Sequence, residues 1–345
     1  MREAAGRPGD FCGQTITDDG IQSDLDCHPA RIVAKTGAAG LAHTDWPRIS
    51  IVTPSFNQAQ YIEETIRSVV TQGYPNLEYI VIDGGSTDGS QDVIRRYADQ
   101  MACWVSEPDR GQSDALNKGF SRATGQICGF LNSDDLYRPG TLQMAAEAYL
   151  ACRTKDRFWH AFGVEDFDEN GPRYVHRPKL AGRLADWVDN VANLHQPGVF
   201  WSRELHAAVG GFDPDFQYAF DRKFFAGAIL KGYRFTVDAH RIATNFRYHS
   251  QSKTATVGDV DNFGFAPEFI RISEWMREQA SFGQQLRIRL GRVARRHEKA
   301  GNALLQRNSP RRMARLGELF LAGIVYPPVS RTRYYWGAVR RGLFG

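Results

Sequence analysis

Four short apolar runs, each followed by a polar turn and then by a helix-like pattern, constrain the fold most strongly. They lie at residues 48–53 (RISIVT), 77–82 (LEYIVI), 102–105 (ACWV) and 127–131 (ICGFL). Short apolar runs bounded by turn residues are typical of buried strands. Strands that alternate with helices predict βαβ units with right-handed crossovers. We therefore expect an α/β fold with a mostly parallel central sheet.

Polar turns follow the first, second and fourth of these runs, at residues 54–57, 83–89 and 132–135. In an open α/β sheet, ligands bind beyond the carboxyl ends of the strands. The adjacent carboxylates of Asp134 and Asp135 can hold a hard cation there; alternatively, they form a solvated turn that caps the next helix. Neither a G-x-G-x-x-G turn nor a P-loop sequence is present, which disfavours dinucleotide and P-loop nucleotide sites. The pattern suits a nucleoside held by a carboxylate and a diphosphate held through a metal.

Composition and cysteine usage point to a globular protein without a membrane span. Of the 345 residues, 42% are hydrophobic and 24% charged, which is ordinary for a soluble globular chain. The five cysteines include no C-x-x-C pair, so we expect reduced thiols rather than disulfides or a zinc site. No apolar run approaches the roughly 20 residues of a membrane span, and no secretory signal is recognisable near the N-terminus. These features predict a cytoplasmic protein.

Charge is distributed unevenly along the chain. Residues 280–345 contain 14 Lys and Arg against two Glu, a net charge of +12, so the remainder of the chain carries −8. Arg interleaved with Leu, Trp and Tyr is typical of an amphipathic element that meets anionic lipid. A helical cap packed on the body, with solvated arginines, is the alternative. Nucleic-acid binding is disfavoured because no recognised module accompanies the charge.

Four motifs identify a resemblance to a known family. Ser50–Asn57 (SIVTPSFN), Ile80–Gly89 (IVIDGGSTDG), Asp114–Gly119 (DALNKG) and Phe130–Asp135 (FLNSDD) resemble, in order and spacing, the family 2 glycosyltransferases of the GT-A fold. The resemblance extends from about Arg48 to His249. It implies a GT-A type nucleotide-sugar-binding α/β sandwich. The domains we expect are a flexible leader (1–47), a catalytic domain (48–256) with a donor half (48–136) and an acceptor half (137–256), and a basic helical C-terminal extension (257–345).

The resemblance assigns five residues to the donor. It implies that Pro54 and Phe56 line the base pocket and that Asp83 hydrogen-bonds the base, commonly uracil. Asp114 lies where the family approaches the donor, and Asp134 faces the ribose or the sugar. For the acids, the alternative roles are a turn acid at Asp83 and a helix-face acid at Asp114. A UDP-sugar is the favoured donor.

The metal site is implied in the same way. Asp135 and His249 would hold Mg²⁺ or Mn²⁺, with Lys253 as a phosphate partner. For His249, the alternatives are a contact to the diphosphate and a structural role. The chain has S-D-D where the family pattern is D-x-D, which leaves open how many carboxylates touch the ion. His195 is interpreted as structural or as shaping the acceptor site.

The acceptor half supplies the expected catalytic base. Asp221 opens a helix at the position where the family places that base; its alternative role is a first-turn acid stabilised by the helix dipole. The resemblance implies an inverting, metal-dependent glycosyltransferase that moves a single sugar to a glycan or lipid-linked acceptor in cell-surface polysaccharide assembly. A processive synthase is disfavoured because Q-x-x-R-W is absent. The non-enzymatic alternative is a catalytically silent scaffold that binds sugar nucleotides or glycans. With the basic tail, the expected location is cytoplasmic, with peripheral association at the inner face of the membrane.

Overall fold

The computed structural model describes residues 46–179, 184–189, 194–256, 265–306 and 312–325. Almost all of the predicted leader, residues 1–47, lies outside these ranges. The strands are β1 (Ile49–Ser55), β2 (Leu77–Asp83), β3 (Cys103–Ser106), β4 (Ile127–Phe130), β5 (Leu136–Tyr137), β6 (Trp159–Asp168), β7 (Gly171–His176), β8 (Val199–Ser202) and β9 (Thr236–Arg247). The helices are α1 (Ile62–Val70), α2 (Ser90–Arg96), α3 (Gln112–Phe120), α4 (Thr141–Ala151), α5 (Leu184–Val188), α6 (Arg203–Val209), α7 (Phe220–Leu230), α8 (Lys253–Thr256), α9 (Phe265–Gln279), α10 (Phe282–Gln306) and α11 (Arg312–Val325). Short 3-10 turns lie at η2 (Ala98–Gln100), η3 (Lys155–Arg157) and η4 (Gln196–Gly198).

One nine-stranded sheet runs through both predicted halves, in the order β3-β2-β1-β4-β8-β6-β9-β5, with β7 paired to β6. The four predicted strands are present as β1 to β4 and pair in parallel. The second half adds β8, which runs antiparallel to both β4 and β6, and the parallel pair β6 and β9. The predicted α/β sheet is confirmed. The boundary between the donor and acceptor halves stays a prediction.

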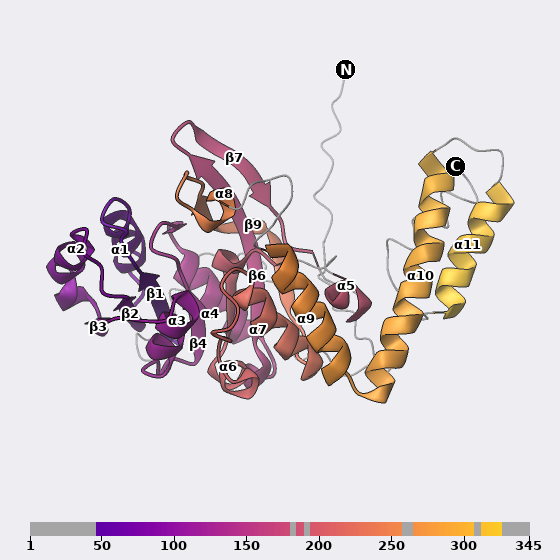
Figure 1. Cartoon of the computed structure of the whole chain (residues 1–345), viewed down its shortest axis with the longest axis horizontal. Helices are drawn as coiled ribbons and strands as arrows, with labels where there is room; N and C mark the ends of the chain where they lie inside the picture. Colours follow the sequence, from indigo (N-terminus) through magenta and orange to yellow (C-terminus); the bar gives the residue numbers. More distant parts are fainter. Residues whose placement is uncertain (1–45, 180–183, 190–193, 257–264, 307–311, 326–345) are drawn as a thin grey trace, which may run out of the picture.

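The sheet is buried on both faces, which explains its continuous apolar strands. Successive side chains of a strand point to opposite faces, so Ile51 of β1 joins one core cluster and Val52 joins the other. Helix α1 covers the first face with Ile62 and Ile66. Helices α3 and α7 cover the second, and Figure 1 shows α3 and α7 on the same side of the sheet. Because helices cover both faces of the sheet, a ligand can bind only at the ends of the strands.

The turns after β1 and β2 are tied together by hydrogen bonds. Asn57 adopts the left-handed backbone conformation with φ of 51°, which Asn tolerates better than most residues. Its backbone N–H donates to Ser86 Oγ at 2.8 Å, and its side-chain Oδ1 accepts from the Thr87 N–H at 3.0 Å. The two polar turns therefore form one edge of the candidate site.

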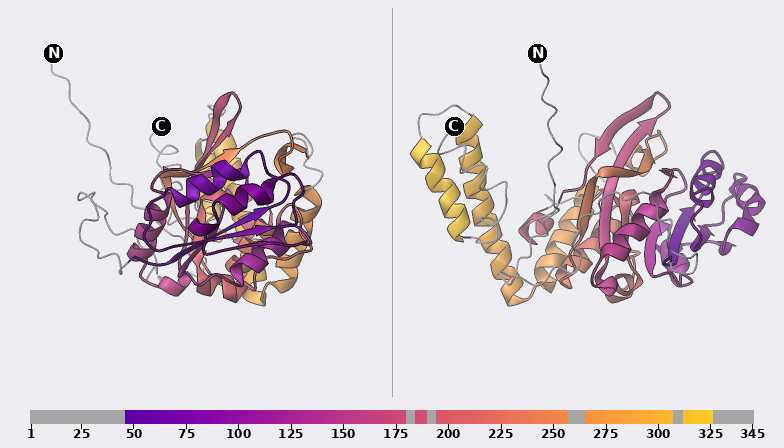
Figure 2. Two further views of the ribbon diagram at one scale, coloured as in Figure 1. Left: turned by 90° about the vertical axis from the view of Figure 1, so that its left-hand side faces the viewer. Right: turned by 180° about the vertical axis from the view of Figure 1, so that it is seen from behind.

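Helices α10 and α11 lie side by side at the end of the molecule away from α2 and β3 (Figures 1 and 2). They run through the predicted basic extension. Arg292 and Arg295 of α10 form ion pairs with Asp189, and Arg295 also pairs with Asp186 of α5. Part of the positive charge is therefore neutralised against the body. Among the described residues, no helix is long and apolar enough to cross a membrane.

The expectation of reduced thiols throughout is wrong at one position. Cys152 is disulfide-bonded, whereas Cys103 and Cys128 are free. Pairing depends on which segments meet in space, and spacing along the chain does not show this.

Candidate active site

The two acids after β4 occupy different environments. Asp135 is fully buried; its Oδ1 accepts from the backbone N–H of Arg247 at 3.0 Å, and its Oδ2 from the Asn132 amide at 3.3 Å. Burial, and next the charge of Asp134, raise the pKa of Asp135 well above its usual value. Asp134 lies closer to the surface and contacts His249, with Asp134 Oδ2 and His249 Nε2 2.9 Å apart. Two close carboxylates, one of them desolvated, favour a neutralising cation.

His249 is brought to this turn from 115 residues away. Its ring lies against Tyr61, with the ring centroids 4.5 Å apart, and its buried Nδ1 has no hydrogen-bond partner among the described residues. A neutral imidazole beside a carboxylate is a common metal-binding arrangement. The residues present therefore fit a divalent ion. Asp134 Oδ2 is the carboxylate oxygen that contacts His249, whereas each oxygen of Asp135 accepts one hydrogen bond. Ligation of an ion by Asp135 and His249 stays a prediction.

Arg247 connects the acidic turn to β9. Besides its backbone contact to Asp135, its Nε donates to the Asp134 carbonyl at 2.9 Å, and its guanidinium pairs with Glu64 and lies 5.0 Å from the Tyr61 ring centre. This side chain therefore holds both the backbone and the surroundings of the turn. The sequence analysis missed this role, because no local pattern links β9 to a turn more than 100 residues earlier.

Asp83 closes β2 and is fully buried. Its carboxylate accepts from the backbone N–H groups of Gly85 and Ser86, at 3.1 and 2.9 Å, and from the hydroxyls of Ser86 and Ser106. An ionised carboxylate offers about four lone-pair sites, so these donors already engage it. The backbone bonds match the turn-acid alternative, while the two hydroxyls can rotate away. Its role toward a base stays a prediction.

The other three predicted donor residues lie at the edge of the sheet or in α3. Pro54 is buried within β1, and Phe56 follows the strand with 60% of its surface exposed. Asp114 lies in the first turn of α3, where its Oδ2 accepts from the Arg110 N–H at 3.2 Å and lies 3.6 Å from Lys118 Nζ. The Arg110 hydrogen bond, followed by the Lys118 charge, lowers the pKa of Asp114. An exposed aromatic ring is available to stack on a base, and Asp114 is held as a helix-face acid.

Asp221 lies in the wall of a cavity of about 490 Å³ that also reaches Asn132 at the end of β4. It occupies the first turn of α7, and its Oδ1 accepts from the backbone N–H of Arg222 at 2.6 Å. Burial raises the pKa of Asp221 to about 6, against the opposing effect of that hydrogen bond and of the Arg222 and Lys253 charges. A carboxylate with a pKa near neutrality, in a cavity, is a candidate general base.

Lys253 lies between the two parts of the site. Its ammonium donates to Gln112 Oε1 at 3.0 Å and to the Gln217 carbonyl at 2.9 Å, and it lines the same cavity as Asp221. Burial lowers the pKa of Lys253, whereas the charges of Glu268, Asp221 and Asp134 raise it. Lys253 therefore lines the same cavity as Asp221 and feels the charge of Asp134, and its role as a phosphate partner stays a prediction.

The loop before α7 is held by a buried acid that sequence reasoning missed. Glu268 of α9 accepts three backbone N–H groups, those of Gln217, Tyr218 and Ala219, at 2.7, 2.9 and 2.6 Å. These residues lead directly into Asp221. Nothing in the sequence around Glu268 distinguishes it from an ordinary helix acid.

His195 lies on another part of the cavity wall. Burial, and secondarily the neighbouring His176, lower the pKa of His195 to about 3, so the ring is neutral. Its expected role, structural or acceptor-shaping, fits this position. The sequence analysis did not anticipate its two neighbours, Asp166 and His176, which reach the same place from β6 and β7.

Comparisons with known proteins identify the family. The sequence profile described as glycosyl transferase family 2 matches residues 50–206. An uncharacterised glycosyltransferase of Mycobacterium tuberculosis is 32% identical over 193 residues, which cover 54% of this chain and 71% of that protein. The putative teichuronic acid biosynthesis glycosyltransferase TuaG of Bacillus subtilis is 37% identical over 108 residues, covering 30% of this chain and 43% of TuaG.

A solved structure shares the fold. The Staphylococcus aureus TarS structure (residues 1–349) in complex with UDP-GlcNAc superposes with a TM-score of 0.54 and 17% identity, over 86% of this chain and 89% of that one. The four motifs, the shared sheet and the relatives agree. The chain therefore belongs to glycosyl transferase family 2, and it is a glycosyltransferase of the GT-A fold.

Proposed function

We propose that this enzyme performs an inverting, divalent-metal-dependent transfer of a single sugar from a nucleotide sugar to a glycan or lipid-linked acceptor. The observation that carries the proposal is the position of Asp221, whose pKa of about 6 and place in the cavity suit a base that takes a proton from an acceptor hydroxyl. A positioned carboxylate of this kind contributes about 10² to 10⁴-fold to the rate. A single displacement driven by such a base inverts the anomeric centre.

The donor side would use the turns after β1, β2 and β4. Phe56 is exposed for stacking, Asp83 closes the base side, and Asp134 faces the ribose or sugar. The TarS complex with UDP-GlcNAc indicates that this fold accommodates a UDP-sugar, and the name of TuaG points to cell-surface polysaccharide assembly. A UDP-sugar donor and such an acceptor are what we propose for this chain.

Asp134 and His249, with Asp135 behind them, are the residues that would hold Mg²⁺ or Mn²⁺. When bound, such an ion stabilises the negative charge that develops on the leaving diphosphate. Lys253 supplies a second positive group near Asp134. Arg247 keeps the acidic turn in place through its contacts to both acids.

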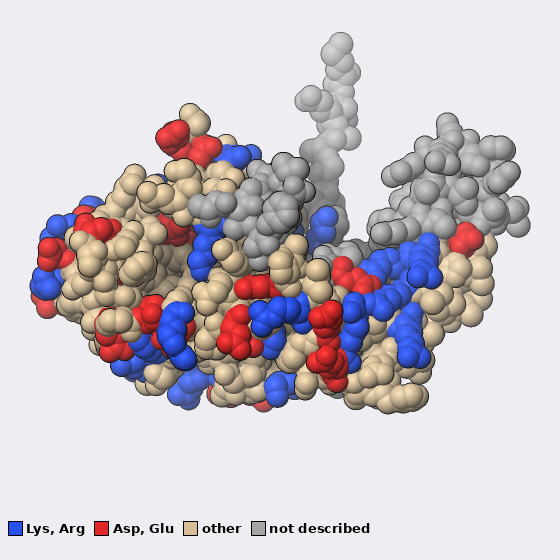
Figure 3. All heavy atoms as spheres, viewed as in Figure 1, with Lys and Arg blue, Asp and Glu red and all other residues tan. Residues whose placement is uncertain are grey.

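Association with an anionic membrane surface from the cytoplasmic side is the corresponding proposal for the basic extension. Helix α10 exposes Phe282, Leu286 and Val293 at helical spacing, with the exposed Arg289 and Arg296 beside them. Figure 3 shows a cluster of Lys and Arg along this helix. Apolar side chains flanked by arginines suit the interface of an anionic bilayer.

A panel of nucleotide sugars tests the proposed reaction. Purified protein is incubated with UDP-, GDP- and dTDP-sugars, an acceptor mixture and Mn²⁺ or Mg²⁺, and released nucleoside diphosphate is followed. We expect release with a UDP-sugar that stops when a chelator is added. NMR of the product reports the configuration at the anomeric carbon. Donor binding without release from any sugar would favour the scaffold alternative, and retention of configuration would contradict the role of Asp221.

A further inference from the structure

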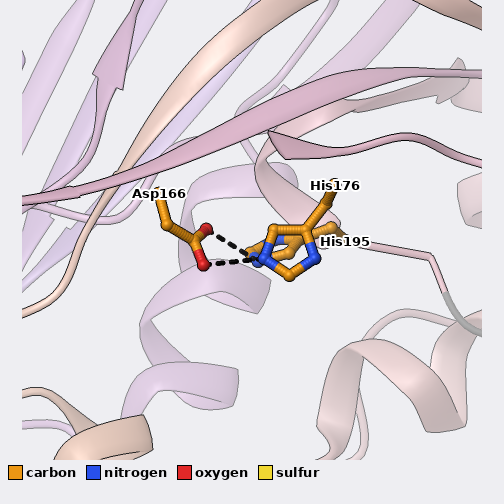
Figure 4. Close-up of side chains that lie close together, drawn as sticks. All are labelled: Asp166, His176 and His195. Atoms are coloured by element: carbon orange, nitrogen blue, oxygen red, sulfur yellow. Dashed lines mark hydrogen bonds and ion pairs between the residues drawn. The ribbon is translucent and has the colours of Figure 1, made fainter. Parts of the chain in front are cut away.

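Three side chains on the cavity wall, away from the acidic turn, form a compact cluster that the proposed reaction does not use. Asp166 comes from β6, His176 from β7 and His195 from the segment before η4 (Figure 4). His176 Nε2 lies 2.7 Å from Asp166 Oδ2, and His195 Nε2 lies 3.6 Å from Asp166 Oδ1. One ligand atom from each residue lies within 4.8 Å of the others, and in the described part of the chain this is the only such group of three.

The sheet geometry builds this cluster. Asp166 and His176 are diagonal neighbours on paired strands, since Asp166 is opposite Tyr174 and Val164 is opposite His176. Diagonal neighbours on one face are within reach of long side chains. A register shift between Asp166 and Phe167 marks a bulge, which re-aims side chains near functional sites.

His195 is held in place independently. Its ring packs edge-on against Phe246 of β9, with ring centroids 5.0 Å apart, and lies 4.3 Å from the ring of His176. The next residue, Gln196, donates its side-chain amide to the Phe130 carbonyl at 2.8 Å. The cluster is therefore pre-organised by three separate elements of the fold.

The acid of the cluster has an unused oxygen. Asp166 Oδ1 is buried and accepts no hydrogen bond from any described residue, although it faces His195. A buried acceptor without a partner has lost its hydrogen bonds to water and has gained none in return. A cation between this oxygen and the imidazoles would supply that partner.

We propose that Asp166, His176 and His195 form a second metal site, for a transition-metal ion such as Zn²⁺ or Co²⁺. Two ligand atoms on one ion with bonds of about 2.1 Å lie about 3 to 3.5 Å apart. The observed separations of 2.7 and 3.6 Å bracket this range, so small side-chain movements admit an ion. Imidazole ligands select Zn²⁺, Co²⁺ or Ni²⁺ over Mg²⁺. The ion would replace the hydrogen bond between His176 Nε2 and Asp166 Oδ2.

This site is separate from the acidic turn. Successive residues on a strand face opposite sides of the sheet. On β9, Phe246 contacts His195, whereas the side chain of Arg247 lies against Tyr61 beside the acidic turn. The side chains of the cluster are 20 to 37% exposed and line the cavity, so an ion can enter from there. Three protein ligands leave a coordination position for an oxygen of a molecule bound in the cavity.

The test is Co²⁺ binding by full-length, untagged protein that has been freed of metal with a chelator. Excess Mg²⁺ occupies the acidic turn, and the visible absorption of Co²⁺ is followed during titration. We expect one Co²⁺ per chain in the wild type. His176→Gln and His195→Gln should each weaken it at least tenfold, since even a supporting residue of a metal site is worth about 10 to 100-fold.

Matched variants separate this site from the others. Asp134→Asn removes the donor-side carboxylate, and His240→Gln removes an exposed histidine outside both sites; Co²⁺ binding should survive both. Electron paramagnetic resonance of Cu²⁺ bound to the wild type, which needs no variant to fold, should show nitrogen coupling from two imidazoles. Absence of binding, unchanged binding in both His→Gln variants, loss in Asp134→Asn or a single-imidazole spectrum would each overturn the proposal.

Discussion

At the scale of single residues, Asp221 carries the sharpest prediction. Asp221→Asn keeps the size of the side chain but cannot accept a proton, so turnover should fall about 10²-fold or more. Donor affinity, measured by calorimetry, should change little. In the wild type, kcat should fall as the pH drops through about 6, because the carboxylate becomes protonated. Near-normal turnover of the variant would leave Asp221 with only its helix-dipole role.

Asp221→Asn should affect stability in the direction opposite to its effect on turnover. Its folded pKa is raised from 3.8 to about 6, so its contribution to stability is full below pH 3.8 and is lost as the pH rises through about 6. At pH 7.5 the buried charge therefore opposes folding. We expect the Tm of Asp221→Asn at this pH to equal or exceed that of the wild type, with the difference shrinking toward pH 4.

The two acids of the turn should separate metal binding from stability. Asp134→Asn should weaken activation by Mn²⁺ and leave the Tm unchanged, since this side chain lies near the surface. Asp135→Ala should also lower the free energy of unfolding by about 1 kcal/mol, because it leaves the part-buried Arg247 N–H without its acceptor. Thermal melts measure the stability of each variant, and the dependence of the rate on Mn²⁺ concentration measures its metal binding. Equal effects of the two changes on the Tm would contradict the assignment.

At the scale of elements, α9 holds the loop that leads into the N-terminal end of α7, where Asp221 lies. Glu268→Gln replaces a carboxylate that accepts three N–H groups with an amide that has a single acceptor oxygen. Charge-assisted bonds are about twice as strong as neutral ones, so we expect a lower Tm and a several-fold lower kcat, with the pKa seen in the rate profile displaced from that of the wild type. Glu274→Gln, an exposed acid on the same helix, is the matched control and should behave as the wild type. An unchanged rate profile in Glu268→Gln would limit Glu268 to a structural role.

At the scale of the whole molecule, α10 carries six of the 14 Lys and Arg of residues 280–345. Truncating the chain before α10 would also remove Ile288 from the hydrophobic core, so surface changes are the cleaner test. Arg289→Glu with Arg296→Glu should abolish co-sedimentation with phosphatidylserine vesicles at low salt, and added salt should weaken wild-type binding because it screens surface charge.

The control for this experiment reverses two exposed cations elsewhere, Arg67→Glu with Lys231→Glu. This control changes the net charge by the same amount as the α10 double variant, and it should bind vesicles as the wild type does. If the control loses binding to the same extent, net charge and not α10 is responsible. If wild-type protein does not bind anionic vesicles at low salt, the alternative of a helical cap packed on the body is favoured. The ion pairs of Arg292 and Arg295 with the body already agree with that alternative in part.

The sequence by itself determined the four parallel strands β1 to β4, and it placed Asp221 at the start of a helix, which is α7 in the structure. These depend on apolar periodicity and turn residues, which act over a few neighbours. It also placed Asp134 beyond a strand end, because parallel strands direct their carboxyl ends to one edge of the sheet.

Only the tertiary structure decided which distant residues meet. It brought His249 to Asp134 rather than to Asp135, placed Glu268 beneath the start of α7, and assembled Asp166 with His176 and His195. The disulfide of Cys152 is also a contact that only the tertiary structure decides. Such contacts follow from strand order, register and bulges, which are set by the packing of the whole sheet and leave no local pattern in the sequence.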